Sequence, residues 1–209
     1  FHPAMRHAGP TRRELGVPTV FNILGPLTNP AYARSALIGC ASPILAPVMA
    51  DVLSRRGVRA LVVRGDDGLD EISTAATTQV WDVTSPTVEH VVLDPTQIGV
   101  ARVDPALLRG GDRQRNAALL RKALGGVDAF EAADPDAEQV GAIVEAVALN
   151  AAAALVAYSS AVADDATASE VPLADRIAAY LPTTRSVLAD GSALTLLERW
   201  ASVTQALRR

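Results

Sequence analysis

Apolar residues follow two different spacings along the chain, and these spacings separate predicted strands from predicted helices. Continuous apolar runs at 35–40 and 58–63 predict buried strands, and apolar residues at helical spacing between Ser42 and Gly57 predict a helix that joins them. A strand, a helix and a second strand in this order are typical of an α/β sheet covered by helices. We therefore expect this fold class.

The later part of the chain continues the sheet and then changes to helices. The segments 78–83 and 87–93 predict two strands that form a hairpin. From Asp104 onward the pattern is helical, and Pro182 should break or kink one of the helices. Helices are expected at 112–124, 138–158, 173–188 and 192–208, with a surface excursion at 127–139 and a polar link at 164–170.

Turn-forming residues organise the first thirty positions. Pro10 and Gly16 delimit a short predicted helix that continues an earlier helical piece at 3–8. The apolar stretch 20–24 is followed by 25–30, where prolines and a glycine impose a fixed backbone path. This rigid segment either positions a preceding strand end under a ligand or forms a purely structural corner, and the pattern leaves both interpretations open.

Composition narrows the class of protein. A chain of 209 residues with 49% hydrophobic and 20% charged content is typical of a globular protein with one core. The formal net charge of −4 provides no bulk excess of positive charge for nucleic acid or an anionic membrane. Cys40 is expected in the core. Because it is the only cysteine, no internal disulfide can form, which favours a reducing compartment. We expect a cytoplasmic protein.

Two further features concern membranes and chain length. The N-terminus carries prolines and charge where a secretion signal would be apolar. The uncharged run 146–163 is long enough to suggest a membrane span, but Asn150, Tyr158 and abundant alanine favour a buried helix. The chain begins at Phe1 without an initiator methionine, so we expect a fragment of a longer protein.

Four carboxylates follow the second predicted strand, at Asp66, Asp67, Asp70 and Glu71. The carboxyl ends of strands are where ligands bind in α/β sheets, and a few carboxylates suit Mg²⁺, which keeps water or phosphate oxygens as its other ligands. A solvated acidic turn is the alternative. The apolar neighbours of Asp70 and Glu71 are poorly explained by that alternative.

A basic segment and a single amide are the other candidate polar groups. Arginine forks bind carboxylates and phosphates in two-point contacts, although a solvated helix face explains a basic segment equally well. Asn150 is expected to be a buried amide with backbone partners rather than a ligand contact. Motifs for a Ser-His-Asp triad, zinc or a dinucleotide are absent from the sequence. The basic residues are His2, Arg6, His7, Arg12 and Arg13.

Five stretches together carry a resemblance to a known family. In order and spacing they resemble anthranilate phosphoribosyltransferases over nearly the whole chain. The stretches are 2–7, 12–16, 21–30, 65–71, and 110–112 together with Asn116. The resemblance implies the α/β catalytic domain of the nucleoside-phosphorylase and class III phosphoribosyltransferase type, in incomplete form.

The resemblance also implies an activity and the residues that serve it. It implies transfer of phosphoribosyl from phosphoribosyl pyrophosphate (PRPP) to the amine of anthranilate, with release of pyrophosphate, in tryptophan biosynthesis. Arg12 would bind the anthranilate carboxylate, with His2 also at the substrate, and Asp70 and Glu71 would bind the Mg²⁺ that accompanies pyrophosphate. No strong general base is expected, because loss of pyrophosphate forms the barrier. The parent protein is expected to be a homodimer.

The sequence departs from the family pattern in several places. The glycine-rich stretches that cradle PRPP and the N-terminal helical domain are absent, so residues 1–209 correspond to the C-terminal part of the catalytic domain. We therefore expect the chain alone to be inactive. Arg64 replaces the usual histidine, Pro182 interrupts a family helix, and 127–139 resembles an insertion.

Two other functions remain as alternatives. A nucleoside phosphorylase shares the architecture, but Arg12 and the pair Asp70 and Glu71 argue against it. A non-catalytic relative that binds nucleic acid should have a basic groove and salt-sensitive affinity, and the net charge of −4 argues against that role.

Overall fold

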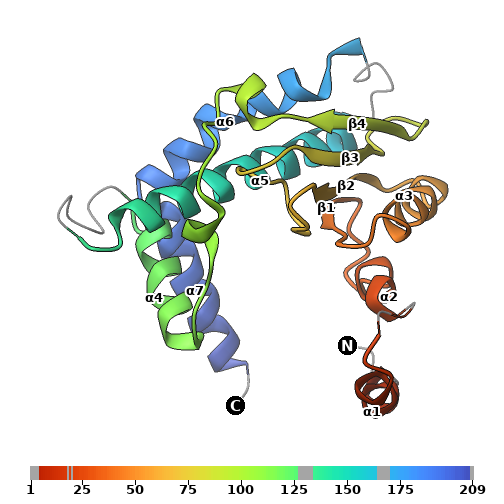
Figure 1. The fold of residues 1–209 in the computed structure, drawn as a ribbon, viewed down its shortest axis with the longest axis horizontal. Helices are drawn as coiled ribbons and strands as arrows, with labels where there is room; N and C mark the ends of the chain where they lie inside the picture. The colour runs from red at the N-terminus through yellow and green to blue at the C-terminus, as the bar shows by residue number, and fades with distance from the viewer. Residues whose placement is uncertain (1–4, 18, 20, 127–133, 164–169, 208–209) are drawn as a thin grey trace.

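Four strands form one mixed sheet in which sequence order equals spatial order (Figure 1). The computed structural model describes residues 5–17, 19, 21–126, 134–163 and 170–207, without the side chains of Met5 and Arg12. Strands β1 and β2 are parallel, whereas β2 pairs with β3 and β3 with β4 in antiparallel ladders. The strands are β1 (Ser35–Gly39), β2 (Arg59–Gly65), β3 (Thr78–Asp82) and β4 (Glu89–Leu93). The predicted strand–helix–strand unit and the predicted hairpin are confirmed.

Some helices cover the two faces of the sheet, and others lie below it in the view of Figure 1. Two 3-10 turns, Pro95–Ile98 and Pro105–Leu108, connect β4 to the helical half. The helices are α1 (Met5–Leu15), α2 (Phe21–Leu27), α3 (Leu45–Arg55), α4 (Arg113–Leu124), α5 (Ala137–Ala163), α6 (Leu173–Ala189) and α7 (Ser192–Ala206). Apart from α2, each of them was predicted from the sequence, with bounds that differ by a few residues.

Alternate residues of β2 face two different cores. Leu61 and Val63 belong to a core shared with α5 and α6, whereas Ala60 and Val62 belong to a core shared with α3. All four side chains are fully buried. A strand buried on both faces reads as a continuous apolar run, which explains the pattern that predicted it.

The sequence predicted a buried helix over 146–163, and the long helix α5 contributes several buried residues to the first core. Among the described residues it is the one helix long and apolar enough to cross a membrane, and half of its most apolar stretch is buried within the structure. Leu149, Ala152, Ala153 and Val156 are at most 2% exposed and belong to the same core as α6. Small alanine side chains let α5 approach its neighbours closely.

Residues 21–27 form a helix, which corrects the expectation of a strand end and a rigid loop there. Asn22 accepts a hydrogen bond at its side-chain oxygen from the Thr19 backbone, 3.1 Å away, and so caps the short helix. Ile23 and Leu27, four residues apart, are buried on one face. Local capping and this two-residue contact surface favour the helix although it contains Pro26.

Pro182 does not break α6, so of the two predicted outcomes, a break or a kink, the break is wrong. The helix runs without interruption from Leu173 to Ala189, and the exposed ring of Pro182 lies on its outer face. Leu181 and Thr184 on either side are buried, so packing on the inner face supports the helix on both sides of Pro182.

The two polar segments expected between helices fall largely outside the described residues. Residues 127–133 and 164–169 are not described, and α5 already begins at Ala137. The last three positions of the expected excursion are therefore helical.

Candidate cation site

The acidic turn joins β2 to β3 and lies against the end of β1. Because β1 and β2 are parallel, their carboxyl ends meet at one edge of the sheet. Gly39 ends β1, and a Cβ atom added to it would lie 1.5 Å from the carbonyl oxygen of Asp70. Backbone therefore contacts backbone at this point, and Asp70 is held directly beside the strand end.

Two of the four carboxylates hold the turn itself. Asp66 accepts hydrogen bonds from the hydroxyl of Thr77 and, at 3.0 Å, from the amide of Gln79. These bonds lower the pKa of Asp66, chiefly through Thr77 and then Gln79. Asp67 accepts a hydrogen bond from the Ser73 hydroxyl at 2.5 Å and another from the Leu69 backbone at 3.2 Å.

The other two carboxylates, Asp70 and Glu71, are exposed and adjacent. Within the described part of the chain, neither is joined by a hydrogen bond or ion pair to another side chain. The surrounding protein removes water from Glu71 and so raises its pKa, and the charge of Asp70 raises it further. Negative charge is therefore left uncompensated at these two positions.

This donor set fits Mg²⁺ that carries most of its own ligands. Among the described residues no group of three or more histidine, cysteine, aspartate or glutamate side chains is arranged to hold a metal ion. Two carboxylates suffice where water or phosphate oxygens complete the coordination of Mg²⁺. Asp70 and Glu71 are the residues that would hold it.

Side chains from other elements hold the second half of the turn. The Thr78 hydroxyl accepts a hydrogen bond from the Ser73 backbone at 2.9 Å, and Arg102 donates to the Ala75 carbonyl at 2.8 Å. Asn150 of α5 contacts the backbone of Ile72, so the prediction of an amide with backbone partners is confirmed, although Asn150 is half-buried. Sequence reasoning missed Ser73, Thr78 and Arg102, because common residue types in common turns carry no distinctive signal.

The residue before the turn, Arg64, makes a contact of its own. Arg64 donates from its Nε atom to the carbonyl of Ala41, at 2.9 Å. This bond links the end of β2 to the residue pair that follows β1. Arg64 therefore ties the two parallel strands together at the edge that carries the carboxylates.

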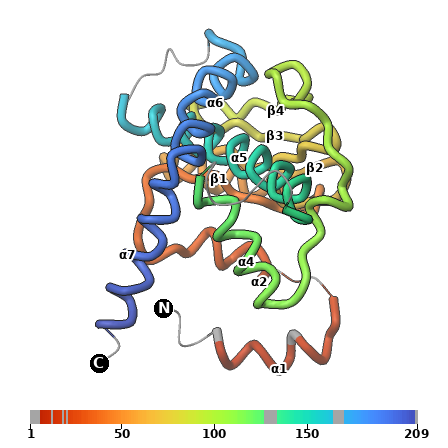
Figure 2. Tube along the Cα trace, turned by 90° about the vertical axis from the view of Figure 1, so that its left-hand side faces the viewer, coloured from red at the N-terminus to blue at the C-terminus, as the bar shows by residue number. Residues whose placement is uncertain are grey.

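The basic segment lies on a different part of the molecule. In both ribbon and tube views α2 lies between α1 and the sheet (Figures 1 and 2). Arg12 falls within α1 but its side chain is outside the described residues, and so is all of His2. The two predicted substrate contacts therefore stay predictions, because the structure describes neither side chain.

The glycine motif at 110–112 has a structural explanation. Asp112 caps α4 by accepting hydrogen bonds from the backbones of Gln114 and Arg115, at 2.9 and 2.8 Å. The Asn116 side chain accepts from the Gly111 backbone at 2.7 Å, and a Cβ on Gly110 would lie 2.9 Å from the Asn116 oxygen. The glycines therefore make room for a capped turn.

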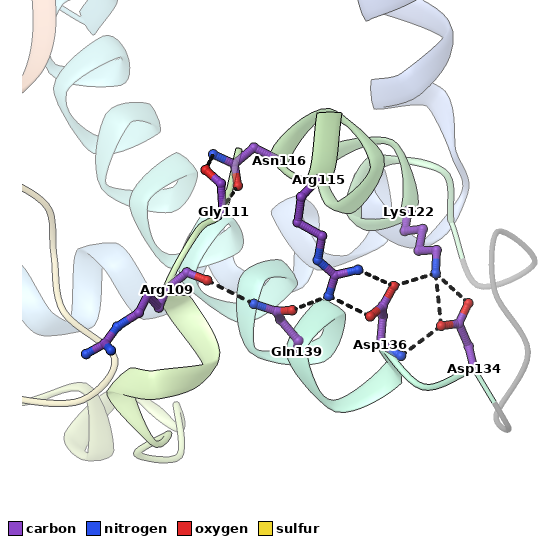
Figure 3. A network of polar contacts seen from close by, with 8 residues as sticks. All are labelled: Arg109, Gly111, Arg115, Asn116, Lys122, Asp134, Asp136 and Gln139. Carbon is purple, nitrogen blue, oxygen red and sulfur yellow. Dashed lines mark hydrogen bonds and ion pairs between the residues drawn. The ribbon is translucent and has the colours of Figure 1, made fainter. Parts of the chain in front are cut away.

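A polar network then joins α4 to the start of α5 (Figure 3). Arg115 contacts both carboxylate oxygens of Asp136, at 2.6 and 2.8 Å, and Lys122 contacts Asp136 and Asp134 at 2.8 and 2.7 Å. Gln139 links Arg115 to the Arg109 carbonyl. The hydrogen bonds from Arg115 and Lys122 lower the pKa of Asp136, and Lys122 lowers that of Asp134.

Comparison with known proteins identifies the class. The sequence profile of the glycosyl transferase family, a/b domain, matches residues 1–193, and the chain belongs to this family. The anthranilate phosphoribosyltransferase of Nocardia farcinica is 46% identical over 209 residues, covering 99% of this chain and 56% of the relative.

Solved structures give the same result. Anthranilate phosphoribosyltransferase from Thermus thermophilus is similar with a TM-score of 0.72 and 39% identity, covering 97% of this chain and 53% of that one. The Saccharomyces cerevisiae enzyme in complex with PRPP and Mg has a TM-score of 0.62 and 25% identity, covering 91% and 50%. The same enzyme with 4-fluoroanthranilate has a TM-score of 0.64 and 25% identity, covering 93% and 53%. The chain spans about half the length of the relatives it matches.

Proposed function

We propose that this chain forms part of an anthranilate phosphoribosyltransferase, and that it supplies the magnesium-binding carboxylates and the anthranilate-binding arginine. The reaction joins the anthranilate amine to the phosphoribosyl group of PRPP and releases pyrophosphate. The observation that carries the proposal is the uncompensated pair Asp70 and Glu71 at the strand edge. The names and ligands of the similar proteins support the choice of substrates.

The acidic pair requires a cation to serve a phosphorylated substrate. Pyrophosphate and two carboxylates repel each other, and Mg²⁺ held between them neutralises charge on the leaving group. Asp70 and Glu71 bind the ion, while Asp66, Asp67 and Ser73 hold the turn that carries them. Arg12 and His2 orient anthranilate, with the Arg12 fork on the carboxylate, so that the amine faces the ribosyl carbon.

The metal role is tested with Mn²⁺ as probe on the 209-residue chain. We expect Asp70→Asn with Glu71→Gln to abolish the Mn²⁺-induced broadening of NMR signals from residues 69–72. Asp51→Asn, an exposed carboxylate of α3, is the matched control and should change nothing. Because its pKa is raised, Glu71 takes up a proton at a higher pH than an ordinary glutamate, whose pKa is 4.5. As the solution is acidified, Mn²⁺ binding should therefore begin to weaken while the pH is still above 4.5. Unchanged broadening in the double variant would refute the assignment.

The anthranilate role is tested in the full-length protein that contains this chain. Arg12→Ala should raise KM for anthranilate by more than about tenfold, since a charge-assisted contact contributes roughly 1.5–3 kcal/mol. KM for PRPP should change much less. Arg13→Ala, next to it on α1, is the control. Equal effects on both substrates would argue against this role of Arg12.

The remaining parts of the proposal concern the protein as a whole. We infer a cytoplasmic homodimer that binds neither nucleic acid nor membranes. Light scattering of the full-length protein tests the dimer. Phosphorolysis of uridine or thymidine without anthranilate transfer would favour the nucleoside phosphorylase instead, and a salt-dependent gel shift without transfer would favour a nucleic-acid-binding relative.

A further inference from the structure

A single side chain of the core helix holds the residue next to the acidic pair. Asn150 lies near the middle of α5, 78 residues further along the chain than Ile72. Its Oδ1 atom accepts a hydrogen bond from the Ile72 N–H at 2.9 Å, and its Nδ2 atom donates to the Ile72 carbonyl at 3.0 Å. The carboxamide therefore pairs with both polar backbone groups of one residue.

The orientation of this amide is determined by its partners. A backbone N–H requires an acceptor and a carbonyl requires a donor, so only one of the two amide orientations satisfies Ile72. Nδ2 also donates to the Ala146 carbonyl, one turn earlier in α5, at 2.9 Å. This third bond anchors the amide to its own helix and fixes the position at which Ile72 must sit.

Ile72 is held by its side chain as well as its backbone. The side chain is 1% exposed and belongs to the core that includes Leu149, the residue before Asn150. Glu71 directly precedes Ile72 in the chain. Asp70, the residue before Glu71, lies against Gly39 of β1. The backbone on either side of the acidic pair is therefore held in place, by Gly39 of β1 on one side and by Asn150 of α5 on the other.

The other hydrogen bonds of the turn act elsewhere along it. Asp66 and Asp67 bind Thr77, Gln79, Leu69 and Ser73, while Thr78 and Arg102 bind the backbone at 73 and 75. In the part of the chain that the structure describes, Asn150 is the side chain that hydrogen-bonds the backbone within 70–72.

We infer that Asn150 is a positioning residue, which sets the direction of Asp70 and Glu71 and thereby the affinity of the cation site. The inference rests on the proposed metal role of the two carboxylates. Groups that orient metal ligands from behind typically change metal affinity about 10- to 100-fold when they are lost. Asparagine suits this role because it combines a donor and an acceptor on one short side chain.

The test compares Asn150→Leu and Asn150→Gln with a control on the same helix. Leucine removes both hydrogen-bonding groups, whereas glutamine keeps the amide but displaces it by one methylene. Ser160→Ala is the matched control, because the buried Ser160 hydroxyl donates to the Val156 carbonyl of its own helix. Two quantities are measured on the 209-residue chain by NMR: the Mn²⁺ dissociation constant at Asp70 and Glu71, and the hydrogen-exchange rate of the Ile72 amide.

We expect Asn150→Leu to weaken Mn²⁺ binding about 10-fold or more and to accelerate exchange of the Ile72 amide. Exchange in β2 should stay unchanged, and Ser160→Ala should behave as the wild type. Asn150→Gln should show the same changes to a smaller extent, and it makes the same test if the leucine variant does not fold.

Two results would overturn the inference. Unchanged exchange at Ile72 would mean that Asn150 does not hold the turn. Faster exchange with unchanged Mn²⁺ affinity would mean that Asn150 is structural and does not position the carboxylates. Failure of the proposed function is recognised separately, because Asp70→Asn with Glu71→Gln would then bind Mn²⁺ as the wild type does, whatever Asn150 contributes.

Discussion

Gly39 lies where no side chain larger than a hydrogen atom has room. An added Cβ would lie 1.5 Å from the carbonyl oxygen of Asp70 and 3.1 Å from its Cβ. Gly141 on α5 is the opposite case, since a Cβ there meets nothing within 4 Å. The two glycines look alike in the sequence, and only the contact with Asp70 shows that the acidic turn requires glycine at position 39.

Alanine at these two positions should therefore have opposite effects. We expect Gly39→Ala to destabilise the chain by about 1–3 kcal/mol, because the methyl group overlaps the acidic turn. Gly141→Ala should stabilise it by about 0.5–1 kcal/mol, because glycine weakens a helix interior. Unfolding in urea measures both changes. A Gly39→Ala chain as stable as the wild type would contradict the close approach at Asp70.

At the scale of elements, a buried ion pair connects α6 to the end of β3. Arg176 contacts the Asp82 carboxylate and donates to the Thr84 hydroxyl at 2.8 Å, and its side chain is 14% exposed. Thr84 in turn donates to Asp82 from its backbone at 2.8 Å. The pair ties α6 to the end of β3.

Removal of one partner should leave an uncompensated buried charge. We expect Arg176→Ala to lower the free energy of unfolding by about 3–5 kcal/mol. Arg55→Ala, which removes an exposed pair with Asp51 on α3, should change it by less than about 1 kcal/mol. Urea unfolding of both variants makes the comparison, and similar small losses would show that the Asp82 pair contributes little.

The network between α4 and α5 predicts a dependence of stability on pH. Folding lowers the pKa of Asp136 and of Asp134 from the ordinary value of 3.8. A carboxyl group whose pKa is lower in the folded state stabilises that state at every pH above its pKa in the unfolded chain. This stabilisation is lost as the pH falls below about 3.8 towards the pKa of the folded state.

Asp136→Asn should remove most of this contribution. We expect the variant to be less stable than the wild type at pH 7, and the difference between the two to shrink as the pH falls below about 4. Asp51→Asn is the control, because its exposed pair with Arg55 should contribute little at any pH. The measurement is unfolding in urea from pH 7 to pH 3, and a constant difference would contradict the role of Asp136.

At the scale of the whole molecule, the sheet separates two cores, and the chain spans about half the length of its relatives. The proposed reaction also requires groups that hold PRPP, and the sequence lacks the glycine-rich stretches that do so in the family it resembles. We expect no transfer from PRPP to anthranilate by the 209-residue chain, and transfer by the full-length protein. An assay of anthranilate fluorescence tests both, and turnover by the chain alone would refute this division of the site.

Much of the fold follows from local patterns. The continuous apolar run of β2, the N-cap Asp112 and the alanine-rich, uncharged run of α5 identify their elements, because these signals belong to residues close together in the sequence. The helix α2 escaped prediction because its stability comes from Ile23 and Leu27 packing under the sheet, and turn formers at 25–30 obscured it. Continuity of α6 through Pro182 likewise depends on packing.

The sequence by itself determined that carboxylates follow β2, that Asn150 pairs with backbone, and which family the chain resembles. Only the tertiary structure decided which carboxylates hold the turn and which remain free for a cation. Thr77 and Gln79 donate hydrogen bonds to Asp66, and Ser73 donates to Asp67. Gly39 and Asn150 instead hold the backbone beside Asp70 and Glu71. The physical reason is that β1 and α5 reach this turn from far along the chain, so their contacts arise only when the sheet and its covering helix assemble.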